Sequence, residues 1–137
     1  TVADLHDLER KVRYAMSFHG ARYIHILVPC PLGWGAPSAK TIELARLARE
    51  TGLFPVFEAE YGEVTNVSKI RRKQPVEKYL MLQKRFAHLF GKKGNPEIVQ
   101  RMQALADRNI ARYGLLGDEQ GDDIPVPEQA DERHHVI

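Results

Sequence analysis

The stretch from Tyr23 to Val28 restricts the possible folds of this chain more than any other segment. It reads Tyr-Ile-His-Ile-Leu-Val and is closed by Pro29, so both of its alternating faces carry apolar side chains. A strand that is apolar on both faces is typical of the interior of a parallel sheet whose two faces are covered by helices. Because two strands alone do not make a stable covered sheet, the missing strands are expected from another chain segment.

Helices are predicted on both sides of this strand. The first covers residues 3–18 and stops at Gly20. The second is expected from about Ala39 to Thr51, with Ser38 as its N-cap and Gly52 just after its end. Helical spacing predicts the following inward residues: Leu5, Leu8, Val12, Ala15 and Met16 in the first helix, and Ile42, Leu44, Ala45, Leu47 and Ala48 in the second.

A second strand is predicted between Leu53 and Tyr61. The stretch alternates only in part and contains Pro55, which suits an edge strand or a strand start. Together with the preceding elements it makes one strand-helix-strand unit. Residues 1–68 are therefore interpreted as the end of a parallel α/β sheet domain.

Residues 69–116 are predicted to form a helical C-terminal extension. One helix follows Pro75 and ends at Gly91, and a second runs from Asn95-Pro96 to Tyr113 and stops at Gly114. The inward stripes are Val76, Tyr79, Leu80, Gln83, Phe86, Leu89 and Phe90 in the first helix, and Ile98, Met102, Leu105, Ala106 and Ile110 in the second.

Residues 117–137 carry seven acids against Arg133 alone and have almost no large apolar residues. This composition predicts an acidic, flexible, disordered tail. The body is correspondingly basic, with two groups: Lys69, Arg71, Arg72 and Lys73, and then Lys84, Arg85, Lys92 and Lys93. Such charges suit an acidic protein or a phosphate-bearing ligand, but most basic runs are solvated faces. No signature of nucleic-acid binding accompanies them.

The chain shows neither a membrane span nor a secretory signal. No apolar run reaches the roughly 20 residues that a bilayer requires, and Asp4, Asp7 and Glu9 stand where a signal would be basic and then apolar. We therefore expect a cytoplasmic protein without a membrane partner. The first residue is Thr1 rather than Met, which suggests a fragment or a processed product.

Cys30 is the single cysteine of the chain, which excludes an internal disulfide framework. It lies just past the end of the predicted buried strand, where ligand sites of α/β sheets are found. Gly33 and Gly35 would let the backbone approach a bulky ligand, and Trp34 would shield that ligand from water. From spacing alone Cys30 is a metal ligand, a reactive thiol or a buried structural residue, and the last is the commonest role of a free cysteine.

Three blocks of sequence together resemble a known family. They are residues 23–35, residues 41–56 (Thr-Ile-Glu-Leu-Ala-Arg-Leu-Ala-Arg-Glu-Thr-Gly-Leu-Phe-Pro-Val), and Pro75-Val-Glu-Lys-Tyr-Leu80 with Phe86. In this order and at these separations they are similar to the C-terminal part of the thiamine-diphosphate-binding beta subunit of pyruvate and related 2-oxoacid:ferredoxin oxidoreductases. The resemblance extends from about residue 5 to residue 115.

This resemblance implies a function and a set of site residues. The family converts a 2-oxoacid and coenzyme A to an acyl-CoA and carbon dioxide, and passes electrons to ferredoxin or a similar acceptor. In cluster-bearing members, three cysteines near the start of the beta subunit and a fourth in the strand-Pro-Cys-Pro loop hold a 4Fe-4S cluster near the thiamine cofactor. Cys30 occupies that fourth position, and Gly33, Trp34 and Gly35 become cofactor-binding candidates.

The chain also departs from the family pattern. The Gly-Asp-Gly motif that, with a later Asn, holds Mg²⁺ and thiamine diphosphate is absent, as are the other three cysteines. The chain is therefore expected to act only with the other subunits of a complex that bind most of the cofactor. The alternative is a non-catalytic assembly module in which Cys30 is buried and free of metal, and in which the basic surface and the acidic tail dock neighbouring subunits.

Overall fold

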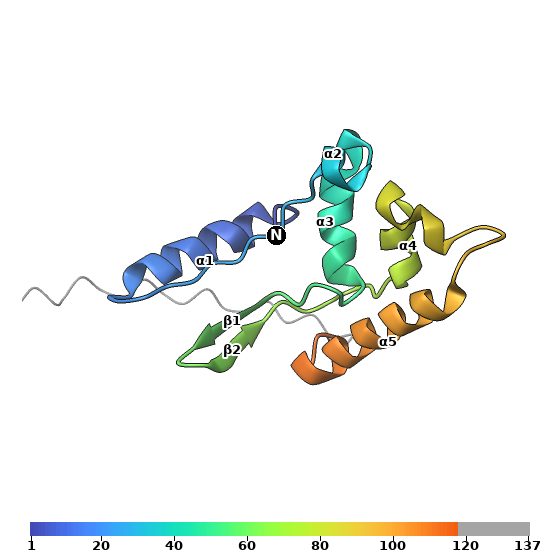
Figure 1. Ribbon diagram of the computed structural model, residues 1–137. Coiled ribbons are helices and arrows are strands. Elements are labelled where there is room, and N and C mark those ends of the chain that lie inside the picture. Colours follow the sequence, from blue (N-terminus) through green and yellow to red (C-terminus); the bar gives the residue numbers. More distant parts are fainter. Residues whose placement is uncertain (118–137) are drawn as a thin grey trace, which may run out of the picture.

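The computed structural model describes residues 1–117, so the predicted tail lies outside the described residues except for Gly117. It is a mixed α/β structure with a two-stranded sheet (Figure 1). The elements are α1 (Leu5–Ser17), α2 (Pro31–Trp34), η1 (Ser38–Lys40), α3 (Thr41–Glu50), β1 (Phe57–Glu60), β2 (Glu63–Val67), α4 (Val76–Met81), η2 (Lys84–Leu89) and α5 (Pro96–Tyr113), where η marks a 3₁₀ helix.

The main hydrophobic core lies among α3, α4, η2 and α5. Its buried members are Leu44, Leu47, Ala48, Val76, Tyr79, Leu80, Leu89 and Ala106. A smaller cluster joins Ile70, Ile110 and Leu115 beside it. The predicted inward residues of α3 are confirmed except for Ile42, which is exposed, and in α5 Ile98 and Leu105 are also exposed. An apolar stripe read from periodicity is therefore wider than the face that the neighbouring helices cover.

The predicted buried strand at Tyr23–Val28 is not found. The chain returns from the end of α1 toward α2 as an extended segment (Figure 1) that pairs with no strand of residues 1–117. Tyr23 is 86% exposed, and Ile24, Ile26 and Val28 are also exposed. Leu27 alone packs against the main core. The described chain provides no neighbouring strand for this segment, so its other apolar side chains remain uncovered.

The second predicted strand exists as β1, but its partner differs from the prediction. β1 pairs antiparallel with β2, with Phe57 opposite Val67 and an irregularity between Glu58 and Ala59. The hairpin turns at Tyr61 and Gly62, which have φ angles of +51° and +89°. Two consecutive positive φ values are typical of the primed turns that match strand twist. The sequence prediction missed β2 because Tyr-Gly lacks the Asn or Asp that usually marks such turns.

The two helical predictions after residue 69 had different outcomes. α5 is confirmed: the Asn95 side chain accepts a hydrogen bond from the Ile98 N–H at 3.2 Å, and Gly114 ends the helix with a left-handed φ of +57°. The helix predicted between Pro75 and Gly91 is divided into α4 and the 3₁₀ helix η2. Similarly, Ser38 begins the 3₁₀ helix η1 rather than capping α3 directly.

α1 confirms the predicted first helix but not its predicted buried face. The Asp4 carboxylate caps the helix by accepting a hydrogen bond from the Asp7 N–H at 3.0 Å. None of the helix residues is fully buried, and Leu5 is 69% exposed. α1 lies alongside the β1–β2 hairpin, away from the helical core (Figure 1). None of the helices within residues 1–117 is long and apolar enough to cross a bilayer.

Candidate functional site

Cys30 stands at the start of a single helical turn rather than in an irregular loop. It is the N-cap of α2, and its Sγ accepts a hydrogen bond from the Gly33 N–H at 3.3 Å. Pro31 favours this turn, because its fixed φ suits the first helical position and its missing N–H is not needed there. Cys30 is exposed. The burial of Cys30 that the alternative interpretation expects is therefore not found in the described chain. We call residues 30–35 the cysteine turn.

The described residues do not complete a metal site around Cys30. Across residues 1–117, no three His, Cys, Asp or Glu side chains come together where they could hold a metal ion. His25, in the segment before Cys30, is exposed and lies edge-on to Phe54 with ring centroids 5.3 Å apart. A cluster bound by Cys30 would therefore take its remaining ligands from outside the described residues.

Gly35 and Gly33 are needed for contacts within the chain. Gly35 ends α2 with a φ of +63°, and its carbonyl accepts a hydrogen bond from the Lys84 N–H at 3.3 Å. A Cβ at Gly35 would lie 2.7 Å from the Lys84 Cβ, which is closer than such atoms approach, so only glycine fits. A Cβ at Gly33 would lie 3.3 Å from the Cys30 Sγ and crowd the thiol.

Trp34 is covered by a residue that the sequence analysis did not single out. The Arg85 guanidinium lies 4.0 Å from the Trp34 ring centroid and 4.7 Å from that of Phe86. A cation–π contact at an exposed site contributes about 0.5–1 kcal/mol. In the sequence, Arg85 was only one member of a basic group. No local pattern indicated its contact with Trp34, because the two residues are about fifty positions apart in the chain.

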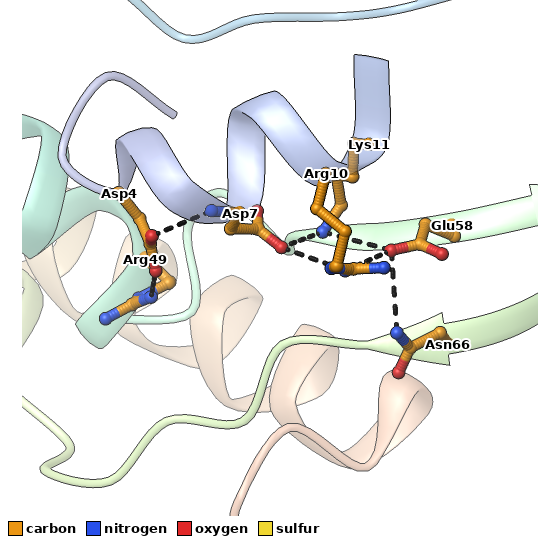
Figure 2. Close-up of polar contacts among 7 residues, drawn as sticks. All are labelled: Asp4, Asp7, Arg10, Lys11, Arg49, Glu58 and Asn66. Carbon is orange, nitrogen blue, oxygen red and sulfur yellow. Dashed lines mark hydrogen bonds and ion pairs between the residues drawn. The ribbon is translucent and has the colours of Figure 1, made fainter. Parts of the chain in front are cut away.

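A second polar site lies between α1 and the hairpin (Figure 2), and we call Asp7, Arg10, Lys11, Glu58 and Asn66 the charge cluster. Arg10 Nη2 lies 2.5 Å from Glu58 Oε1 and 3.1 Å from Asp7 Oδ1. Lys11 Nζ lies 3.3 Å from the same Glu58 oxygen and also pairs with Asp7. Asn66 Nδ2 donates to Glu58 at 3.5 Å. This arrangement joins α1 to both strands.

The charge cluster keeps its two carboxylates ionised. Burial is the largest influence on Asp7 and disfavours its charged form, but the hydrogen bonds and charges of Lys11 and Arg10 together outweigh it and lower the pKa of Asp7. For Glu58, burial again opposes ionisation, and Arg10 with Lys11 lowers the pKa. Figure 2 shows that Arg10 and Lys11 each contact both carboxylates and that the Asn66 amide also contacts Glu58. The cluster therefore fits a structural role rather than proton transfer.

Comparisons with known proteins give the chain its family. No protein-family model matches the sequence. It is 49% identical over 109 residues to the pyruvate synthase subunit PorB of Methanosarcina barkeri, a match that covers 80% of the chain and 37% of that protein. It is 35% identical over 141 residues to PorB of Pyrococcus furiosus, covering 90% of the chain and 40% of that protein. The chain matches a segment of the beta subunit of 2-oxoacid:ferredoxin oxidoreductases.

This match confirms the resemblance predicted from the sequence. The chain is also 39% identical over 103 residues to the ketoisovalerate oxidoreductase subunit VorB of Pyrococcus abyssi, which covers 74% of the chain and 32% of that protein. It thus spans two fifths or less of the length of these relatives. Since the relatives are named for two different 2-oxoacids, their names indicate the class of enzyme rather than one substrate.

Proposed function

We propose that this chain is part of a multi-subunit 2-oxoacid oxidoreductase. The reaction joins the acyl group of a 2-oxoacid to coenzyme A, releases carbon dioxide and passes two electrons, one at a time, to ferredoxin or a related acceptor. The observation that carries the proposal is the similarity to PorB and VorB subunits over most of the chain. On this proposal the chain works in the cytoplasm with the other subunits and has no activity alone.

Within this function, the proposed role of Cys30 is to supply the fourth thiolate of a 4Fe-4S cluster. Three features of the cysteine turn support it. The thiol is exposed, so ligands from another segment can reach the same iron-sulfur core. The Gly33 N–H already points at the Sγ from 3.3 Å. Hydrogen bonds to the ligand sulfur are one of the means by which a protein sets the potential of a cluster. When bound, the cluster would supply one-electron transfer.

Gly33, Trp34 and Gly35 remain proposed cofactor-facing residues in this scheme. Their contacts within the chain shape the turn that presents Cys30, and the backbone at Gly33 leaves space around the thiol. Thiamine diphosphate and Mg²⁺ would be held mainly by residues outside this chain, because their Gly-Asp-Gly motif does not occur in it. Thiamine would act as the electron sink for the decarboxylation.

The extended segment at Tyr23–Val28 is proposed to be a strand of the thiamine-diphosphate-binding sheet. Its side chains are apolar on both faces yet exposed, and its backbone has no strand partner within residues 1–117. Apart from the Leu27 carbonyl, which accepts a hydrogen bond from the Val2 N–H at 3.3 Å, the backbone groups of such a segment can pair with neighbouring strands. Such pairing would place Cys30 directly beyond the end of a sheet strand, where ligands of α/β folds bind.

The test is a set of Cys30 substitutions in the assembled complex. We expect Cys30→Ala to remove or convert one cluster and to leave thiamine bound. Cys30→Ser should be intermediate, with an altered potential, since an alkoxide replaces a thiolate poorly as an iron ligand. The measurements are low-temperature paramagnetic resonance of the reduced complex and reduction of an external dye driven by the 2-oxoacid.

The matched control for these substitutions is Leu32→Ala. Leu32 lies in the same turn and is exposed, so its truncation tests whether any change in this turn disturbs the cluster. We expect wild-type signals and wild-type dye reduction. If Cys30→Ala instead keeps every cluster signal and full electron transfer, Cys30 is not a ligand and the chain serves assembly rather than electron transfer.

A further inference from the structure

We infer that Arg85 is a positioning residue for Cys30: its guanidinium, stacked on Trp34, holds the cysteine turn against η2. Trp34 and Cys30 belong to the same helical turn, in which the Trp34 N–H donates to the Cys30 carbonyl at 2.9 Å. A contact that fixes Trp34 therefore also fixes the orientation of Cys30. The effect of the Arg85–Trp34 contact on a cluster rests on the proposed function. The contact is present in the structure whether or not a cluster binds.

Arg85 is anchored to the core through a buried amide. Gln83 is only 1% exposed, and its Nε2 donates to the Tyr79 carbonyl of α4 at 2.6 Å. Its Oε1 accepts a hydrogen bond from the Arg85 Nε at 2.9 Å. Because both ends of the amide are engaged, its orientation is determined, and that orientation directs the guanidinium. This explains why a polar residue stands in the apolar stripe of α4 and η2.

The turn is also held to η2 through the backbone. The Gly35 carbonyl accepts a hydrogen bond from the Lys84 N–H, and the two residues approach so closely that Gly35 has no room for a Cβ. Trp34 also packs against the main core beneath it. Arg85 covers a face of the Trp34 ring, and this is the one of the three contacts that a single surface substitution can remove.

The stack also places a positive charge on Trp34, which belongs to the same turn as Cys30. Arginine does not lose its proton at ordinary pH, and its planar group is suited to lie on an indole ring. The potential of a cluster depends on the charge and the hydrogen bonds around its sulfurs. Removing this cation should therefore stabilise the oxidised cluster and make its reduction potential more negative.

The experiment compares Arg85→Gln, Arg85→Lys and the control Arg101→Gln in the assembled complex. Arg101 is an exposed arginine of α5 that pairs with Glu97, one turn earlier in that helix. Trp34 is the only tryptophan of the chain, so fluorescence of the complex minus that of a Trp34→Phe complex isolates its signal. The two measurements are acrylamide quenching of Trp34 and the midpoint potential of the cluster by redox titration with paramagnetic resonance.

We expect Arg85→Gln to lower the equilibrium constant for the contact between residue 85 and Trp34 by about two- to fivefold. Quenching of Trp34 by acrylamide should then increase, and the midpoint potential of the cluster should become more negative. Arg85→Lys keeps the charge but loses the planar contact, so quenching should rise while the potential shifts less. Arg101→Gln should match the wild type in both measurements. This separation of the charge from the planar contact would not arise if Arg85 merely contributed to general stability.

The inference is overturned if Arg85→Gln behaves like Arg101→Gln, or if Trp34 quenching rises with no shift of the cluster potential. Failure of the proposed function is recognised separately, because Cys30→Ala would then leave every cluster signal in place. In that case the quenching of Trp34 alone decides whether Arg85 holds the turn.

Discussion

The two halves of this structure are held together by different forces. The α3–α4–α5 half packs apolar side chains against one another, and Leu44, Ala45 and Leu80 are almost completely removed from solvent. The half that contains α1 and the hairpin has no buried residue in its helix and is joined chiefly by the charge cluster (Figure 2). Apolar burial contributes far more to stability than partly exposed ion pairs.

The difference also shows where the chain has apolar surface to cover. The exposed large apolar residues of the first thirty positions are Leu5, Tyr14, Met16, Tyr23, Ile24, Ile26 and Val28. Contiguous exposed apolar surface commonly marks a contact with another chain or domain. The helical half has a buried core of its own, although it also exposes Ile42, Ile98 and Leu105. The first half presents the larger set of exposed apolar residues, on which the rest of the proposed subunit would pack.

The largest expected effect is in the helical core. Leu80→Ala removes a fully buried side chain and should lower the free energy of unfolding by about 2–5 kcal/mol. Leu5→Ala truncates an exposed side chain of α1 and should change the free energy of unfolding by no more than about 0.5 kcal/mol. Urea denaturation followed by circular dichroism measures both. Equal losses for the two variants would mean that α1 is as tightly packed as the core.

Two glycines provide the next comparison. Gly52 has a φ of +80°, and a Cβ there would lie 2.6 Å from Ile110 Cγ1 and 2.9 Å from the Ala106 carbonyl oxygen. Gly52→Ala combines backbone strain with overpacking and should cost about 2–4 kcal/mol. Gly62 in the hairpin also has a positive φ but has open space around it, so Gly62→Ala should cost only about 1–2 kcal/mol. The midpoint of thermal unfolding should therefore fall further for Gly52→Ala than for Gly62→Ala.

A smaller effect is expected from the charge cluster. Glu58→Gln keeps the shape of the side chain but removes the charge that faces Arg10 and Lys11. Because these groups are partly exposed, we expect a loss of about 1 kcal/mol. The control Glu9→Gln breaks an exposed pair with Arg13 within α1 and should cost less than about 0.5 kcal/mol. Hydrogen exchange at the hairpin amides should increase for Glu58→Gln alone.

The smallest effect is a pH dependence confined to the α1 half. The pKa values of Asp7 and Glu58 are lower in the folded chain than in the unfolded chain, so the unfolded chain binds more protons in acid. Their stabilisation is complete above the ordinary carboxyl range, near pH 4, and is lost as the pH falls through the lower folded values. Acid should therefore release α1 from the hairpin at a higher pH than that at which the core unfolds. Asp7→Asn should make the release of α1 less dependent on pH. Amide exchange along a pH series would detect it.

The sequence by itself determined the elements whose signals are local. α5 is capped by the Asn95 amide at its start and by the left-handed Gly114 at its end, and both signals act within one turn of the helix. The end of α3 was predicted from Gly52, which follows the helix with a positive φ, whereas the cap expected at Ser38 was not found. The position of Cys30 beside Pro31, and the likeness to the oxidoreductase beta subunit, also followed from consecutive residues. None of these conclusions needs a contact between distant segments.

Only the tertiary structure decided which segments meet. It paired β1 with β2 rather than with Tyr23–Val28, and it left the latter segment exposed despite its apolar faces. It also placed Arg85 on Trp34 and Glu58 between Arg10 and Lys11. Periodicity reports that a face is apolar or charged, but not which partner covers it. That choice depends on which distant segments can bury surface and satisfy backbone groups together, and residues 1–117 provide partners for only part of the chain.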